Sequence, residues 1–177
     1  LTYVGCYTDE SKEGIHIFET DSETGAFRPV GRVGGIENAI HLTLNAGRTR
    51  LYAGLGLPEY GAPAQNGAVA AYEVKGDALL PLNHCPVGVT PPCYVALDPA
   101  EQALVFAEYT NAVAGVFELA ADGRFTGAPA VTVRHEGEGP NKPRQDKAHA
   151  HCAEVTPDGR YLCVADLGLD QARVYDF

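Results

Sequence analysis

Four similar strand-like segments recur along the chain at intervals of roughly fifty residues, and this repeat restricts the fold more than any other feature. The segments are Leu1–Val4, Leu51–Gly54, Leu104–Ala107 and Leu162–Ala165. Short apolar runs bounded by Gly, Pro and Asp are typical of β-strands. A period of about fifty residues built from strands predicts a β-propeller, in which each blade is a four-stranded antiparallel sheet.

Further strand-like runs surround these segments in a constant order. We expect an inner strand before three of them, a third strand after all four, and then an outer strand in the first three blades. The inner strands are Ile40–Leu44, Tyr94–Leu97 and Cys152–Val155; the third strands are Ile15–Phe18, Val69–Tyr72, Gly115–Phe117 and Arg173–Tyr175; the outer strands are Phe27–Val30, Leu79–Leu82 and Val131–Val133. The prediction is an all-β chain of about three and a half four-stranded antiparallel blades, over residues 1–35, 36–88, 89–135 and 149–177.

The first predicted blade has no inner strand, and the last has no outer strand. Propellers close by completing one blade with strands from both termini, so this pattern indicates a chain that continues beyond Phe177. The alternative is a half-propeller that closes against a second copy, although its end blades would then stay three-stranded. On either interpretation, the missing C-terminal half or another chain is needed to close the ring.

The charge and cysteine content exclude several classes of partner. A formal net charge of −10 argues against nucleic acid or an anionic membrane, and no run of about 18 apolar residues predicts a membrane span. The five cysteines lack zinc-ligand spacing and are expected to be buried free thiols of a reducing compartment. With no visible secretory leader, a cytoplasmic location is expected.

The glycine pairs of the chain do not predict a cofactor site. Gly34-Gly35 and Gly137-Glu-Gly139 do not lie between a strand and a helix N-terminus. That placement is what allows a glycine-rich loop to bind phosphate groups. We therefore predict no cofactor.

Positive charge gathers in one segment of this acidic chain. Residues 134–151 contain four of the thirteen Lys and Arg and three of the six His, namely Arg134, Lys142, Arg144, Lys147, His135, His149 and His151. Because a cleft concentrates the potential of the charges that line it, this segment predicts an anion-binding site at one rim. The alternative is a solvated basic loop whose charges balance Glu136, Glu138 and Asp146.

A predicted hairpin places two of these histidines beside a carboxylate. Thr156-Pro-Asp-Gly-Arg160 has the composition of a tight turn, so the strands on its two sides should be antiparallel neighbours. His149 and His151 then share a rim with Asp166, and Glu108 holds the matching place in the preceding blade, so both carboxylates are expected to flank the channel mouth. Two histidines two residues apart in an extended segment should point the same way.

His151 is the candidate catalytic base or acid, because imidazole can take either role near neutral pH. His149 is expected to support it, and Asp166 or Glu108 could orient a histidine, as the third member of a catalytic group does. The alternative is structural in each case: a histidine bonded to backbone, or a carboxylate capping its own loop. A histidine metal pair is a further alternative, but no other ligands stand at suitable spacing, so we predict no metal.

Several of these motifs resemble the lactonase family of seven-bladed β-propellers. They are Arg144-Gln145, His149-Ala-His151, Thr156–Arg160 and Asp166–Asp170, while Tyr3–Thr8 with Gly14–Phe18 is similar to the family's N-terminus. The family includes propeller-type 6-phosphogluconolactonases and fungal carboxymuconate-lactonising enzymes. The resemblance extends over the whole chain but over only about half of a seven-bladed ring.

The resemblance implies hydrolysis of a small anionic sugar lactone. His151 would activate water or protonate the leaving alkoxide, and Arg144 would bind a phosphate or carboxylate, or stabilise the oxyanion. Gln145 could add a neutral donor, and Lys142 could steer or bind the substrate. At Glu108 the family more often has Asn, so this sequence departs from the pattern there.

Two other functions remain open at the level of the sequence. Carboxymuconate cyclisation could use the same residues as lactone hydrolysis. A non-catalytic propeller scaffold is also open, but the chain has no Trp and so lacks the Trp-Asp signature of such repeats. Its ionisable groups also gather at one rim instead of spreading over a face.

Overall fold

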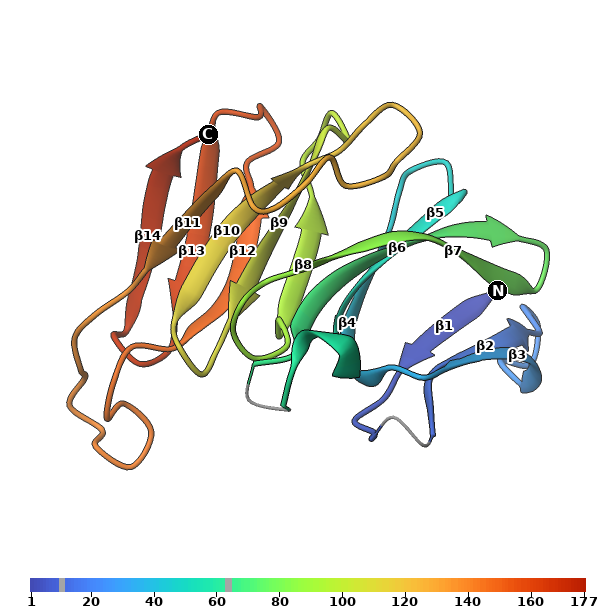
Figure 1. The fold of residues 1–177 in the computed structure, drawn as a ribbon, viewed down its shortest axis with the longest axis horizontal. Helices are drawn as coiled ribbons and strands as arrows, with labels where there is room; N and C mark the ends of the chain where they lie inside the picture. The colour runs from blue at the N-terminus through green and yellow to red at the C-terminus, as the bar shows by residue number, and fades with distance from the viewer. Residues whose placement is uncertain (10–11, 63–64) are drawn as a thin grey trace.

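Four antiparallel sheets lie side by side in the computed structural model, which describes residues 1–9, 12–62 and 65–177 (Figure 1). The strands are β1 Thr2–Gly5, β2 Glu13–Thr20, β3 Phe27–Gly34, β4 Glu37–Leu44, β5 Arg50–Gly56, β6 Gly67–Lys75, β7 Ala78–Pro86, β8 Tyr94–Leu97, β9 Ala103–Glu108, β10 Val113–Glu118, β11 Val131–Arg134, β12 Ala150–Val155, β13 Tyr161–Asp166 and β14 Gln171–Asp176. Within the described residues, the only helical element is the 3₁₀ turn Pro58–Tyr60. The all-β prediction is confirmed.

The sheet order matches the propeller pattern. The sheets run β1-β2-β3, β4-β5-β6-β7, β8-β9-β10-β11 and β12-β13-β14, so each blade follows the chain without a crossover. The four repeated segments fall in β1, β5, β9 and β13. Consecutive strands joined by short turns pair antiparallel, which is how each four-stranded blade forms.

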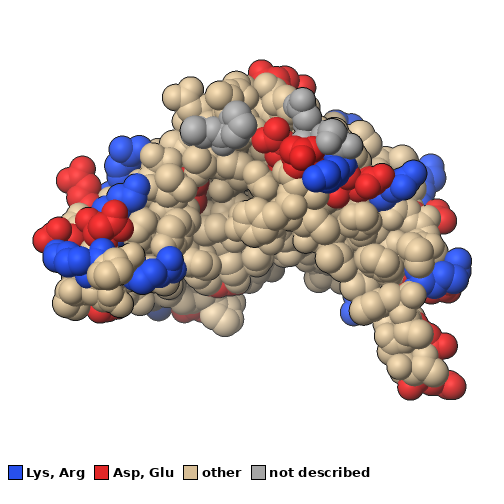
Figure 2. Space-filling view, turned by 90° about the horizontal axis from the view of Figure 1, so that it is seen from below, with Lys and Arg blue, Asp and Glu red and all other residues tan. Residues whose placement is uncertain are grey.

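The first and last blades have three strands each, as predicted. Over the described ranges, β1 pairs only with β2, and β14 pairs only with β13. Seen from the rim at the bottom of Figure 1, the molecule is a half-ring with a hollow along one side (Figure 2). The structure is a partial propeller in which β1 has no inner neighbour among the residues that are described.

The strands β5 and β9 are apolar along their length because a neighbouring blade packs on each of their two faces. In β9, Leu104 and Phe106 face the cluster shared with blade two, whereas Val105 and Ala107 face the cluster shared with blade four. All four side chains are fully buried. A strand between two packed layers reads as a continuous apolar run, unlike the alternating pattern of a strand with one solvated face. The repeated segments in β5 and β9 were recognisable for this reason.

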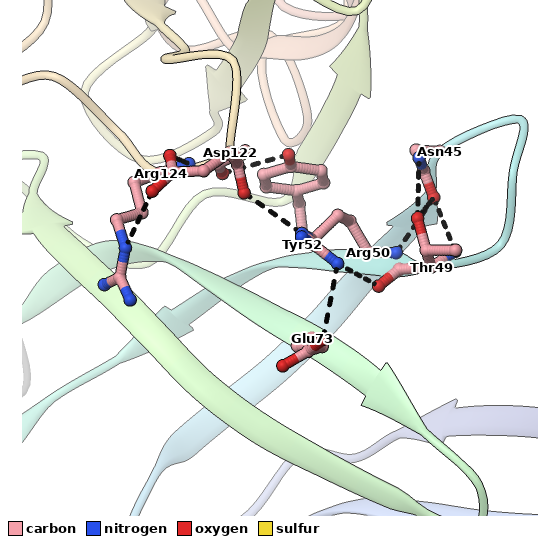
Figure 3. Close-up of polar contacts among 8 residues, drawn as sticks. Asn45, Thr49, Arg50, Tyr52, Glu73, Asp122 and Arg124 are labelled. Atoms are coloured by element: carbon pink, nitrogen blue, oxygen red, sulfur yellow. Dashed lines mark hydrogen bonds and ion pairs between the residues drawn. The ribbon is translucent and has the colours of Figure 1, made fainter.

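Polar contacts tie blades two and three together at the rim remote from the histidines (Figure 3). Arg50 Nε donates to the carbonyl oxygen of Asp122 at 3.1 Å, and the Tyr52 hydroxyl donates to that of Gly123 at 3.0 Å. Gly123 has φ of 84°, and a Cβ there would lie 2.9 Å from the Tyr52 hydroxyl. Only glycine therefore fits this turn without strain.

The structure bears on two expectations from composition, that the cysteines are buried free thiols and that no segment spans a membrane. All five cysteines are free thiols, but only Cys85 is buried, so the expectation that all five are buried is wrong. Of the other four, Cys152 lies on the inner strand β12 and Cys163 on β13 of the last blade, whereas Cys6 and Cys93 lie outside the strands. In the described parts of the chain, no helix combines the length and apolar character needed to cross a membrane.

Candidate functional site

The segment rich in positive charge forms a long loop at one rim of the partial propeller. Residues 135–149 join the outer strand of blade three, β11, to the inner strand of blade four, β12. The loop lies at the lower edge of Figure 1, where the 3₁₀ turn between β5 and β6 also lies. The predicted hairpin is present as well, since Ala150 on β12 pairs with Asp166 on β13. The loop and Asp166 therefore lie at the same rim, as the sequence predicted.

The two histidines differ in environment because β12 is irregular. The β12–β13 register shifts between Ala150 and Cys152, so His151 lies at a β-bulge. A bulge interrupts the regular alternation of side chains. His149 is only 5% exposed, whereas His151 is exposed and lines a groove. Of the two rings, only His151 lines the groove, whereas a regular strand would have been expected to place both there.

This groove, which we call the rim groove, has a volume of about 660 Å³ and draws residues from all four blades. Its polar and aromatic lining includes Tyr7, Asn38, Thr90, Tyr109, Arg144 and His151. Asn38 has φ of 47°, which is unusual for a residue other than glycine. Backbone in such a conformation is concentrated at ligand-binding sites, and here it lies in the groove wall.

Arg144 is the one Lys or Arg among the described residues that line the rim groove. It sits in a turn closed by hydrogen bonds from the backbone N–H groups of Arg144 and Gln145 to the carbonyl oxygen of Asn141, at 2.9 and 2.7 Å. Within the described chain, its guanidinium forms no ion pair with a carboxylate. A guanidinium in this state can bind an anionic ligand through two parallel hydrogen bonds.

The structure corrects the assignment of Gln145 as a substrate donor. Gln145 is 7% exposed, and its Oε1 accepts from the Asn141 N–H at 2.9 Å. Its Nε2 donates to the Leu167 carbonyl at 3.0 Å and to Asp170 Oδ1 at 2.6 Å. Both amide protons already have acceptors, so Gln145 organises the loop.

Lys142 also lies outside the groove. Its Nζ is 2.6 Å from Glu138 Oε1, and both side chains are well exposed. Neither residue lines the rim groove. An exposed ion pair contributes little to stability or to binding, so the assignment of Lys142 to substrate binding is not supported by its position.

Asp166 and Glu108 lie at the predicted rim, but both are buried, so the expectation that they flank the channel mouth is wrong. Glu108 is fully buried and accepts hydrogen bonds from the Thr90 hydroxyl and from the backbone N–H groups of Thr110 at 2.7 Å and Asn111 at 2.8 Å. Asp166 is 2% exposed, and its Oδ1 accepts from the N–H groups of His149 and Leu169. Each carboxylate caps the loop after its strand.

The carboxylate of Asp166 contacts the ring of His135, a histidine for which the sequence predicted no role. His135 Nδ1 is 2.6 Å from Asp166 Oδ2, and Nε2 is 2.9 Å from the Tyr175 hydroxyl. His135 follows β11 of blade three, whereas the other two residues belong to blade four. No motif spacing connects residues that meet only when two blades pack. This buried group links the 135–149 loop to blade four.

Cys93 and Tyr109 are groove residues that the sequence did not single out. Cys93 Sγ lies 3.6 Å from the His151 carbonyl oxygen and 3.4 Å from that of Ala107. Burial, with a further contribution from the nearby Glu108, raises the pKa of the Cys93 thiol to about 12. The thiol is therefore a neutral donor that helps hold the bulged backbone at His151. In the sequence, the feature that could have pointed to Tyr109 is its position directly after the strand β9, at the rim of the site.

We expect Cys93 to react slowly with iodoacetamide at pH 8, because the thiolate is the reacting form and a pKa near 12 leaves about one thiol in 10⁴ ionised. The measurement is mass-spectrometric mapping of alkylation over time. The same chain unfolded in urea serves as the control. Equal rates at Cys93 in the folded and unfolded chains would contradict this expectation.

Comparison with known proteins places this geometry in a family. The model of the family described as lactonase, 7-bladed beta-propeller, matches residues 1–177. The chain belongs to this lactonase family. A 6-phosphogluconolactonase of Bacillus subtilis is 33% identical over 177 residues, which cover 99% of this chain and 48% of the relative.

Solved structures agree with membership of the lactonase family. A crystal structure from Bacteroides fragilis matches with a TM-score of 0.86 and 29% identity, covering 99% of this chain and 47% of that one. The periplasmic gluconolactonase PpgL of Pseudomonas aeruginosa matches with a TM-score of 0.85 and 25% identity, over 99% and 49%. The chain thus spans about half the length of the family members that it matches.

Proposed function

We propose that this chain contributes to the hydrolysis of a small anionic sugar lactone, most similar to the reaction of a 6-phosphogluconolactonase. The observation that carries the proposal is that His151 and Arg144 line the same rim groove. One can act as an acid or base and the other can bind an anion. The name of the Bacillus subtilis relative supports this substrate class.

The chemistry requires water to add to the ring ester and the ring oxygen to leave. His151 takes a proton from the attacking water and returns one to the leaving alkoxide. Such acid–base help accelerates reactions by about 10²–10⁴-fold, which suits an ester that already hydrolyses by itself. Arg144 binds the phosphate or carboxylate of the substrate and thereby fixes the ester beside the histidine.

The remaining predicted site residues take supporting roles in this proposal. His149 is buried and contacts the Tyr109 carbonyl, while Asp166 and Glu108 cap the loops that carry the groove residues. These three residues act through the groove residues and not on the substrate. The proposed enzyme uses no cofactor.

Closure of the ring and cellular location are part of the same proposal. β1 has a free inner edge among the described residues, and the matched relatives are about twice as long. We propose that further blades, from a continuing chain or from another chain, complete the channel wall opposite the rim groove. The free cysteines favour a cytoplasmic location.

Arg144→Ala is expected to raise KM for a phosphorylated lactone by roughly tenfold or more, because a hydrogen-bonded ion pair with the ligand is lost. KM for an uncharged aldonolactone should change much less. Arg144→Lys should recover part of the loss, since a point charge does not reproduce the two-pronged guanidinium contact. The measurement is steady-state kinetics on both substrates with the full gene product.

The matched control is Arg160→Ala. Arg160 follows the β12–β13 turn at the opposite rim, where its guanidinium contacts Tyr161. The replacement of Arg160 by Ala should leave KM unchanged for both lactones. Equal effects of Arg144→Ala on the charged and uncharged substrates would remove the anion-binding role.

A further inference from the structure

The ring of Tyr109 contacts the rings of both His149 and His151. The centroids of Tyr109 and His149 are 4.2 Å apart, and the two planes are almost parallel, at 11°. The centroids of Tyr109 and His151 are 5.6 Å apart, and these planes are almost perpendicular, at 86°. Offset-stacked and edge-to-face arrangements are the two favoured geometries of aromatic pairs. Tyr109 thus connects the buried ring of His149 with the ring of His151 at the rim groove.

His149 fixes the buried end of this group of rings. Its Nδ1 is 3.1 Å from the Tyr109 carbonyl oxygen, and its Nε2 is 3.3 Å from Asp146 Oδ1. The hydrogen bond from His149 is the main reason that the pKa of the Asp146 carboxyl lies below its ordinary value. An N–H of the His149 ring donates to one of these two acceptors, and the ring is buried, so its orientation is restricted, and Tyr109 stacks against it.

His151, by contrast, has no polar partner for its ring in the described residues. The carboxylates expected to orient it are used elsewhere: Asp166 contacts His135, and Glu108 caps the Thr110–Asn111 turn. The rings of catalytic histidines are usually oriented by a hydrogen bond to a third group. Here the ring contact that the structure provides is with Tyr109.

We propose that Tyr109, held by His149, is the positioning residue that orients the His151 imidazole in the rim groove. The inference rests on the proposed lactone hydrolysis for its catalytic meaning. The orienting effect itself does not depend on that reaction. A side chain with several accessible rotamers loses most of them when its ring packs against a fixed aromatic ring. The Tyr109 hydroxyl has no hydrogen-bond partner among the described residues, so the ring is the part that acts.

The kinetic test compares Tyr109→Leu with Tyr109→Phe in the full gene product. Loss of one aromatic pair should lower kcat by roughly 3- to 10-fold in Tyr109→Leu, with KM nearly unchanged. Tyr109→Phe keeps the ring and should recover most of the loss. His149→Gln retains a donor for the Tyr109 carbonyl but removes the stacked ring, and it should lower kcat in the same direction.

The second readout is the NMR spectrum of His151 in the resting protein, which requires no substrate. Stacking beside Tyr109 shifts the His151 ring protons by the tyrosine ring current, and Tyr109→Leu should abolish that shift, whereas Tyr109→Phe should keep it. A folded Tyr109→Leu protein with unchanged kcat, or with unchanged His151 ring signals, overturns the proposal. If the wild-type protein hydrolyses no lactone, the proposed function fails, and the NMR comparison alone then decides whether Tyr109 orients His151.

Discussion

His151→Ala is expected to lower kcat for lactone hydrolysis by about 10²-fold or more, the usual effect of removing an acid–base catalyst. His151 is the one histidine of the described chain that lines the rim groove, so no other imidazole can take over its role. KM should change little, because substrate affinity is assigned to Arg144. The measurement is steady-state kinetics with a phosphorylated lactone, corrected for spontaneous hydrolysis.

A suitable control for His151→Ala is His84→Ala. His84 is exposed on β7, at the outer edge of blade two, where it contacts Tyr60 and Glu59. Its replacement should leave kcat unchanged. If His151→Ala retained full turnover while remaining folded, His151 would be a structural residue and the proposed mechanism would be wrong.

Asp166→Ala is expected to lower the free energy of unfolding by about 3–5 kcal/mol, because it leaves several buried hydrogen-bond donors without their acceptor. The side chains of Asp166 and His135 are both 0% exposed, so the partners of the lost carboxylate cannot turn to bulk solvent. The same change leaves the backbone N–H groups of His149 and Leu169 without their acceptor. Urea unfolding followed by circular dichroism measures the effect.

Asp176→Ala is the matched control for this stability prediction. Asp176 lies at the end of β14 and is exposed, so its replacement should change the unfolding free energy by less than about 0.5 kcal/mol. An unfolding free energy for Asp166→Ala equal to that of the wild-type protein would mean that the His135–Asp166 contact does not hold the 135–149 loop.

The strands could be predicted because local sequence determines them. β5 and β9 are packed between neighbouring blades, and β13 packs on blade three with one face, so all three read as short apolar runs bounded by turn residues. The rim of the site was also predictable, since a tight turn after β12 necessarily brings Asp166 back beside Ala150.

The side-chain partners at the site could not be predicted in the same way. His135 meets Asp166 only because the loop after blade three folds over blade four, and nothing in the local sequence encodes that packing. Gln145 is polar and adjoins Arg144, yet its side-chain amide forms hydrogen bonds with backbone groups of the loops around it. The bulge at His151 separated two histidines that a regular strand would have placed together.

The most direct test of the account is the hydrolysis of 6-phosphogluconolactone by the full gene product that contains this chain, measured against the spontaneous rate and beside uncharged gluconolactone. We predict a clear acceleration, with kcat/KM about tenfold or more higher for the phosphorylated lactone, as one charged hydrogen-bonded contact would give. His151→Ala should remove the acceleration for both substrates. A folded protein that leaves both lactones at their spontaneous rates would contradict the account.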